Sequence, residues 1–385
     1  MRRGVLVTLL ALATAVAVHQ EATAVAGSVA RRAPTLHREY VFEDGSIWVY
    51  DIDRAHRLVQ QIPLPQAQGV RGVGVGLPQH TLYVSYGGDG GLNGNGSLLA
   101  FDLLRKRVLW TKTYDTGVDS FAITPDGRTI YMPTGELSPG NQWLVINART
   151  GALLGSLSGG TGPHNTVIGP RGKFVYLGGR NSPYLYVAST STRRVVKQVG
   201  PLQSGVRPFT VNSAETLAFT TATGFAGFQM SSLVTGKVLF TVGFKGFSYD
   251  PSRFDPSAPS HGISLSPDGR ELYVIDGPNS YVHVFAINGP SQAPRAIADI
   301  KLAHPLSGLE SPCTYDCVRN GWLQHSSSGR YVYVGDSGDV IDTRTKRIVA
   351  FLPALDQTRK MLEIDWRLGL PVATTTRTGV GPVRG

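Results

Sequence analysis

The fold is decided by a short segment that recurs along the chain, and its clearest copy reads Ile263-Ser-Leu-Ser-Pro-Asp-Gly-Arg-Glu-Leu-Tyr273. An apolar stretch precedes Pro-Asp-Gly, and a second stretch follows it and ends on tyrosine. Proline presets its own φ and glycine accepts a positive φ, so this tripeptide favours a tight turn. The segment therefore predicts two antiparallel strands joined by a turn.

The segment has two other clear copies and three weaker ones. Their terminal aromatic residues lie at positions 83, 131, 176, 219, 273 and 333, at intervals of 43 to 60 residues. A second kind of hairpin alternates with the first, as in Trp143-Leu-Val-Ile-Asn-Ala-Arg-Thr-Gly-Ala-Leu-Leu-Gly155, where a polar turn separates two apolar strands. Two hairpins in about 45 residues supply four strands, which is the blade of a β-propeller.

The two ends of the chain supply the seventh blade. Residues 47–59 form a hairpin of the second kind with no first hairpin before it, and residues 361–374 form a hairpin of the first kind with no second hairpin after it. Joining them closes the ring and removes an exposed sheet edge. We expect an all-β, seven-bladed β-propeller over residues 45–376, after a linker at 27–44 and before a tail at 377–385.

Composition agrees with this class of fold. Glycine accounts for 46 of 385 residues, charged residues for 17% and hydrophobic residues for 41%. Apolar content is too high for disorder, glycine has no three-residue period, and the glycine content is unlike that of a helical bundle.

Residues 1–26 have the pattern of a signal peptide. Arg2 and Arg3 precede an uncharged apolar run from Gly4 to Val18, and Ala24-Val25-Ala26 supplies small residues for cleavage. The run is shorter than the ~20 residues of a membrane span, so we expect a secreted protein, extracellular or periplasmic, without a membrane span. In such an oxidising compartment we expect Cys313 and Cys317 to form a disulfide.

The formal net charge of +10 suggests an acidic partner, although it could also serve solubility alone. No nucleic-acid-binding motif is present, so an acidic glycan or another small anionic ligand is the favoured partner, and nucleic acid is not. We expect a monomer.

The repeat resembles a known family. Leu82-Tyr-Val, Leu272-Tyr-Val-Ile-Asp and Ser266-Pro-Asp-Gly-Arg are similar to the YVTN-type repeats of seven-bladed propellers. The resemblance implies the same fold. It leaves the function open, because such propellers serve as surface proteins, binding modules, lactonases and lyases.

Candidate site residues follow from repeat position at the start of the innermost strand of each blade, where the channel of a propeller opens. The residue six before the proline of the turn is Asp119, His164 or His261 in the clear copies. The degenerate copy gives Arg207, and the first and sixth blades contribute Arg71 and the pair Trp322 and Gln324. These residues are far apart in the sequence but would converge on one axis.

Each candidate also has an ordinary structural interpretation. The histidines could stabilise the ring through backbone carbonyls, a role the YVTN resemblance implies, or they could bind or react with a ligand. Together with Asp119 they could also hold one divalent metal ion in the channel. Arg71 and Arg207 could bind a carboxylate or phosphate, or pair with Asp119 or Glu363. Glu363 and Asp365 alternate along the closing strand and therefore share a face.

Two classes of function fit these residues. The fold plan is similar to that of propeller polysaccharide lyases, in which case Arg207 would neutralise a uronate carboxylate and His164 and His261 would be base and acid in a β-elimination. The alternative is a non-catalytic binding or surface propeller, and a lactonase-type hydrolase is less favoured. Whether the protein is an enzyme is left open by the sequence, with the lyase preferred.

Overall fold

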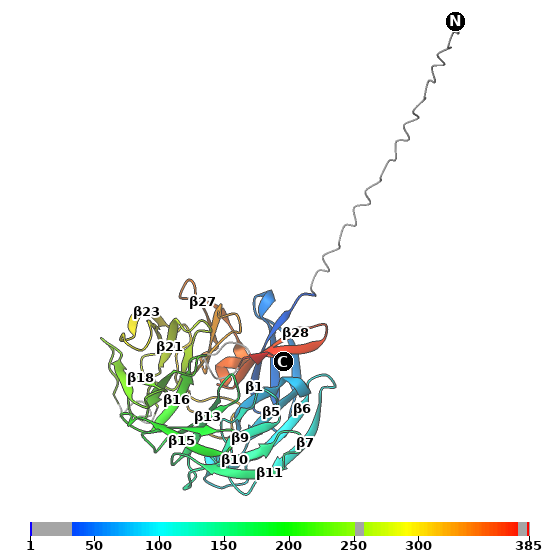
Figure 1. Ribbon diagram of the computed structural model, residues 1–385, viewed down its shortest axis with the longest axis horizontal. Helices are drawn as coiled ribbons and strands as arrows, with labels where there is room; N and C mark the ends of the chain where they lie inside the picture. Colours follow the sequence, from blue (N-terminus) through cyan, green and yellow to red (C-terminus); the bar gives the residue numbers. More distant parts are fainter. Residues whose placement is uncertain (2–32, 251–257, 376–382, 385) are drawn as a thin grey trace. The chain divides into compact units, whose positions relative to one another are not determined.

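The computed structural model describes residues 1, 33–250, 258–375 and 383–384, and in this part of the chain the strands form seven antiparallel sheets. Six sheets have four strands and the seventh has six. Figure 1 shows the blades following one another around a ring in chain order. The predicted seven-bladed β-propeller is therefore confirmed.

The six regular blades are built from consecutive strands, which run in order from the channel outward. The first and second blades are β4 (Val70–Gly76), β5 (Thr81–Tyr86), β6 (Ser97–Asp102) and β7 (Arg107–Thr113), then β8 (Ala122–Ile123), β9 (Thr129–Pro133), β10 (Gln142–Asn147) and β11 (Leu153–Ser158). The third and fourth blades are β12 (Pro163–Ile168), β13 (Phe174–Gly179), β14 (Leu185–Ser189) and β15 (Arg194–Val199), then β16 (Val206–Val211), β17 (Leu217–Ala222), β18 (Gly227–Ser232) and β19 (Val238–Gly243). The fifth and sixth blades are β20 (Ile263–Leu265), β21 (Glu271–Asp276), β22 (Tyr281–Ala286) and β23 (Arg295–Lys301), then β24 (Trp322–His325), β25 (Tyr331–Gly335), β26 (Asp339–Asp342) and β27 (Arg347–Phe351).

Burial follows this order of strands. Every residue of β12 and β16 is buried, whereas the residues of the outer strands β7 and β15 are exposed or partly buried, apart from the buried Val199 at the end of β15. The inner strands pack on both faces against neighbouring blades, and the outer strands have one face in water. The helices of the described residues are the short 3-10 helices Ile52–Arg54, Leu77–Gln79, Gly88–Gly91 and Pro353–Gln357, and none of them has the length and apolar character needed to cross a membrane.

The repeated tyrosine of the second strand links several blades to the next. The hydroxyl of Tyr83 donates to the carbonyl oxygen of Ala148 at 2.9 Å, and that of Tyr176 donates to Oε2 of Glu215 at 2.9 Å. Both acceptors belong to the following blade. A buried tyrosine supplies a large apolar ring for the interface and needs one polar partner for its hydroxyl, which explains why an aromatic residue recurs at this position.

The closing blade combines both ends of the chain, as predicted, but in a different strand order. It contains β1 (Leu36–Glu43), β2 (Ser46–Asp51), β3 (Arg57–Pro63), β28 (Met361–Arg367), β29 (Leu370–Thr374) and β30 (Val383–Arg384), in the order β3-β2-β1-β28-β29-β30. In Figure 1 the blue β1 lies beside the red β28.

The strand β1 lies within the segment assigned to a linker at 27–44, so the first blade strand begins earlier than the boundary at residue 45. It takes the position between β28 and β2 that was expected for 370–374, and β29 pairs with the other edge of β28 instead. The charged run His37-Arg38-Glu39 interrupts its apolar alternation, which concealed the strand. Tyr40, Val41 and Phe42 nevertheless pack in the core.

The predicted signal peptide at 1–26 lies outside the described residues apart from Met1. The predicted tail at 377–385 contains the short strand β30, which pairs with β29, and its other residues lie outside the described part. All the strands belong to one compact unit, Thr35–Gly385.

Candidate functional site

Three of the predicted site residues occupy the same place in their blades. Arg71, His164 and Arg207 are each the second residue of an innermost strand, and the register of that strand with its neighbour shifts there. A β-bulge of this kind leaves a residue outside the regular ladder and turns its side chain. The local irregularity therefore directs these side chains toward the same mouth of the channel.

Around the mouth, these side chains form what we call the mouth cluster: Arg71, Asp119, Glu136, His164 and Arg207. Oδ2 of Asp119 accepts from Nη2 of Arg71 at 3.0 Å and lies 3.0 Å from Nδ1 of His164. Glu136 accepts from Arg71 at 3.1 Å and from Arg207 at 3.2 Å. The predicted convergence of Arg71, Asp119, His164 and Arg207 is observed.

Glu136 receives a third guanidinium from Arg180, at 2.9 Å. Burial by itself would raise the pKa of Glu136, but the charges of His164, Arg71, Arg207 and Arg180 hold it well below the usual 4.5. Likewise, the pKa of Asp119 is lowered because Arg71 and His164 outweigh the effect of burial. Both carboxyl groups are therefore ionised in the folded protein.

The two predicted histidines lie close together. The ring centroids of His164 and His261 are 6.1 Å apart, and Trp322 packs edge-on against His261 at 5.8 Å. Nδ1 of His261 lies 3.1 Å from the carbonyl oxygen of Gly321, which can only accept, so this nitrogen carries a proton. Burial and the nearby charges of Arg359 and Arg207 lower the pKa of His261 well below 6.5, so the ring is neutral.

The two ring nitrogens of His164 have different surroundings. Asp119 fixes its Nδ1, while Nε2 is buried and has no hydrogen-bond partner among the described residues. With Asp119 accepting from Nδ1–H, Nε2 is the nitrogen that takes up or gives up the second proton, and the carboxylate stabilises the protonated ring. The pair can therefore move a proton at Nε2 of His164.

Glu136 and Arg180 lie outside the positions that the repeat predicted, because neither residue is at the start of an innermost strand. Both residues follow the second strand of their blade, after β9 and β13. Because the second strand runs antiparallel to the first, its end returns to the same mouth. The signal was present in the sequence, four or five residues after the repeated tyrosine.

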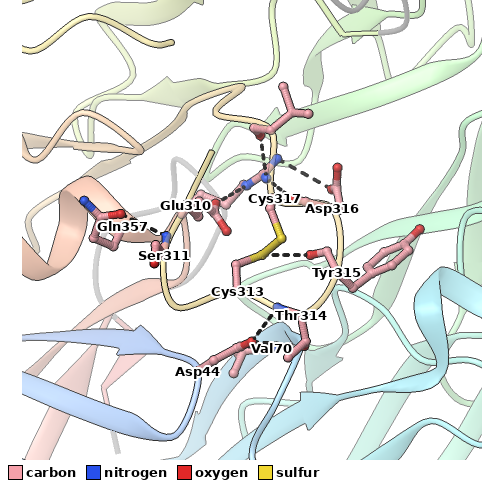
Figure 2. The surroundings of a disulfide bond; sticks show 12 residues. Asp44, Val70, Glu310, Ser311, Cys313, Thr314, Tyr315, Asp316, Cys317 and Gln357 are labelled. Atoms are coloured by element: carbon pink, nitrogen blue, oxygen red, sulfur yellow. Dashed lines mark hydrogen bonds and ion pairs between the residues drawn. A yellow bond between two sulfur atoms is a disulfide. The ribbon is translucent and has the colours of Figure 1, made fainter. Parts of the chain in front are cut away.

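The loop that carries the disulfide also reaches the mouth. Cys313 and Cys317 are bonded, as predicted, and Thr314 of this loop donates to Asp44 (Figure 2). Oδ2 of Asp316 lies 3.4 Å from Nη1 of Arg71 and 3.6 Å from Nη1 of Arg359. The guanidinium carbon of Arg71 also lies 4.9 Å from the centre of the Tyr315 ring.

Arg359 was likewise missed, because the closing blade lacks the proline from which the positions were counted. It lies two residues before β28 and donates to Glu310 and to the carbonyl oxygens of Asp316 and Val318. Arg359 therefore holds the base of the disulfide loop.

Gln324 lies elsewhere. Its amide donates to Thr375, and it lines a cavity in the channel with Val73, Phe121, Val167 and Leu362. The packing here is close: a Cβ on Gly74 would come within 2.9 Å of the Phe121 ring. Trp322 contacts the histidine site, whereas Gln324 belongs to this mostly apolar channel.

The mouth cluster does not suit a divalent metal ion. Donor atoms of Asp119, Glu136 and His164 lie within 4.8 Å of one another. However, Arg71, Arg180 and Arg207 already supply positive charge to the two carboxylates at 2.9–3.2 Å. A cation placed among three guanidinium groups would be repelled, so we assign no metal to this site.

These features define a seven-bladed β-propeller with a buried charged mouth. No family model matches the chain, and no curated protein matches it. Among solved structures, it is similar to a functionally unknown protein from Desulfotomaculum acetoxidans DSM 771, with 15% sequence identity, a TM-score of 0.53, and coverage of 68% of this chain and 81% of that chain. This likeness concerns the fold alone, and membership of the YVTN-type family stays a prediction.

Proposed function

We propose that the mouth cluster binds an acidic saccharide and cleaves it by β-elimination at a uronate. The observation that supports the proposal is the pairing of His164 with Asp119, which leaves Nε2 of His164 without a partner among the described residues, beside a neutral His261. Such a pair is suited to proton transfer, and arginines for a carboxylate lie around it.

The reaction places distinct demands on these residues. Nε2 of His164 removes the C5 proton of the uronate, the C4–O bond breaks, and a C4–C5 double bond forms. The leaving oxygen needs a proton, which the His164 imidazolium returns. His261 is a poor acid, because its proton lies on Nδ1, facing the carbonyl oxygen of Gly321. We therefore assign His261 to positioning the sugar, in place of the acid role expected from the sequence.

The position of the substrate carboxylate is suggested by Asp316. Its carboxylate contacts Arg71 and Arg359 at 3.4 and 3.6 Å, and its side chain is 29% exposed. Such long contacts to a partly exposed group are weaker than the buried pairs of Glu136. A uronate carboxylate entering from solvent would exchange with Asp316, while Arg207 stabilises negative charge that develops at C5.

Access is the main requirement of this proposal. Arg71, Asp119, His164, Arg207 and His261 are only 0–5% exposed. Movement of the loop bearing Tyr315 and Asp316 would open the site, because this loop contacts Arg71 directly. The same burial would strengthen electrostatic stabilisation once the substrate had replaced water.

The test is an assay of purified protein with a panel of uronate-containing glycans, following unsaturated product by ultraviolet absorbance. We expect His164→Ala to lower kcat by roughly 10²–10⁴-fold, whereas His261→Ala mainly raises KM. The matched control is His80→Asn, in the turn after β4 at the end remote from Arg71; asparagine tolerates its positive φ of 52°.

Non-catalytic binding is the competing function, favoured by the near-complete burial of the cluster. A glycan that binds the wild type and the His164→Ala variant equally, with no unsaturated product, would exclude the lyase and leave a binding protein. If no panel glycan binds at all, the mouth cluster is structural and both functions fail.

A further inference from the structure

A second charged cluster lies where the ends of the chain meet. His37 and Glu39 alternate on β1, and Glu363 and Asp365 alternate on β28. The register places His37 opposite Asp365 and Glu39 opposite Glu363. Directly opposed residues of neighbouring strands project to the same face, so the four side chains form one group, the seam cluster.

The seam cluster contains three buried carboxylates without a cationic partner from lysine or arginine. Glu39, Glu363 and Asp365 are 0%, 1% and 7% exposed. Among the described residues, no arginine or lysine forms an ion pair with any of them; the neighbouring Arg38 pairs with Asp51 and Arg54 also pairs with Asp51. Burying carboxylates in this way is costly unless their charge is balanced.

Glu39 is the most unusual member of the group. Both of its carboxylate oxygens are buried and lack a hydrogen-bond partner among the described residues. Burial and the charges of Glu363 and Asp365 raise its pKa well above 4.5, and the register places Glu39 directly opposite Glu363. Buried polar groups normally have a partner, so a fully buried carboxyl group to which no described residue donates, beside two others, indicates a partner from solution such as an ion.

We propose that the seam cluster binds one divalent transition-metal ion, Zn²⁺ or Mn²⁺, through His37, Glu363 and Asp365, with the carboxyl group of Glu39, unpartnered among the described residues, on the same face. One imidazole nitrogen with carboxylate oxygens is a donor set for these ions, whereas Ca²⁺ prefers oxygen ligands alone. The ion would replace protonated His37 and bound protons as the positive charge that balances the carboxylates.

The distances support a common ion. Ligand atoms of a tetrahedral site with bonds of ~2.1 Å lie roughly 3.4 Å apart. Nδ1 of His37 lies 3.4 Å from Oε1 of Glu363, and donor atoms of His37, Glu363 and Asp365 all lie within 4.8 Å of one another. The 2.6 Å contact of His37 with Asp365 would have to open by less than about 1 Å.

The surroundings hold the ligands and leave a way in. The backbone amide and hydroxyl of Ser327 donate to Glu363 at 2.7 and 2.6 Å, and the backbone amide of His37 donates to Asp53 at 2.9 Å. Such outer contacts orient metal ligands. The side chain of His37 is 33% exposed and so lies at the solvent edge of the group.

Protons are the competing occupants. Hydrogen bonds to Asp365 and Glu363 raise the pKa of His37 to about 10, and burial, against the opposing effect of His37, raises the pKa of Glu363 to about 7. A metal-free seam cluster is thus neutralised by protons, and an ion would displace them on binding. Because β1 and β28 come from opposite ends of the chain, the ion would join the two strands that close the ring.

The test compares thermal midpoints of the EDTA-treated, dialysed protein with Zn²⁺, Mn²⁺, Ca²⁺ or Mg²⁺ added. We expect Zn²⁺ or Mn²⁺ in roughly 100-fold excess over its Kd to raise the midpoint by roughly 3–6 °C, more than Ca²⁺ or Mg²⁺. Titration calorimetry should give one ion per chain. Co²⁺ should develop a visible absorption band, and this band should weaken in His37→Gln.

Glu39→Gln separates metal binding from a purely structural role. It removes the cost of burying an ionisable carboxyl group and also removes a negative charge beside the ion, so the metal-free midpoint should rise while the increment from Zn²⁺ or Mn²⁺ falls. Asp126→Asn, in an exposed turn, is the matched control and should keep the full increment. The proposal is overturned if no ion shifts the wild type, or if Glu39→Gln keeps the whole shift.

Discussion

The mouth cluster and the seam cluster use the same residue types, yet their charges are balanced in opposite ways. At the mouth, the carboxylates of Asp119 and Glu136 receive guanidinium groups at 2.9–3.2 Å, and their pKa values are lowered. At the seam, Glu39 and Glu363 have no guanidinium partner within the described residues, and their pKa values are raised. Burial is comparable, so the neighbours decide the ionisation state.

This difference separates the chemistry available at the two places. A carboxylate fixed in its ionised form can orient a histidine and support proton transfer, as Asp119 does for His164. Carboxylates without guanidinium partners instead favour a proton or a cation from solution. This contrast underlies both proposals, an anionic ligand at the mouth and a cation at the closing blade.

The two clusters should differ most in how the unfolding free energy changes when one carboxylate of each is replaced by an amide. Glu136→Gln leaves Arg71, Arg180 and Arg207 without the carboxylate they share and should cost about 3–5 kcal/mol of unfolding free energy. Glu39→Gln should stabilise the metal-free protein. Urea unfolding in EDTA measures both, and effects of the same sign would refute the distinction between the clusters.

Lowering the pH should first weaken the ion pairs of the mouth cluster. The folded pKa values of Asp119 and Glu136 lie below their usual 3.8 and 4.5, so the unfolded chain binds more protons as the pH falls. The stabilisation by these groups is therefore complete above about pH 5 and is lost as the pH falls toward their folded pKa values. The unfolding free energy, measured from about pH 7 to about pH 3, should fall less steeply with decreasing pH in Glu136→Gln than in the wild type.

A smaller effect is expected at the loop carboxylate. Asp316→Asn removes the anion that occupies Arg71 and Arg359, and should tighten binding of a uronate oligosaccharide by roughly 3–10-fold. Asp268→Asn makes the same change of charge in an exposed turn and is the control. Equal affinities for the two variants, measured by calorimetry, would show that Asp316 does not occupy the ligand position.

The smallest effect on stability should come from the disulfide. The bond joins residues only 4 positions apart, so replacing both cysteines with serine should cost at most about 2 kcal/mol. Because the loop places Asp316 and Tyr315 over Arg71, saccharide affinity should change clearly, whereas the calorimetric unfolding midpoint should change little. Loss of cooperative unfolding would instead mean that the loop supports the whole ring.

The sequence by itself determined the ring and most of the mouth. The period of the turns and aromatic residues predicted six four-stranded blades, and the unpaired hairpins at the two ends predicted the seventh. Equivalent repeat positions brought Arg71, Asp119, His164, Arg207 and His261 together. The cysteine pair followed from spacing and expected compartment. Periodicity is a local property that survives in the sequence, because every blade solves the same packing problem.

Only the tertiary structure decided which charges are neighbours. Glu136 and Arg180 reach the mouth from second strands, Asp316 from a loop, and Arg359 from a blade whose turn lacks the marker proline. The seam cluster depends on β1 pairing with β28 from the opposite end of the chain, in a segment that the repeat pattern leaves as a linker. Pairwise electrostatics falls steeply with distance and with the neighbouring dielectric, so it is set by side-chain contacts that no repeat period encodes.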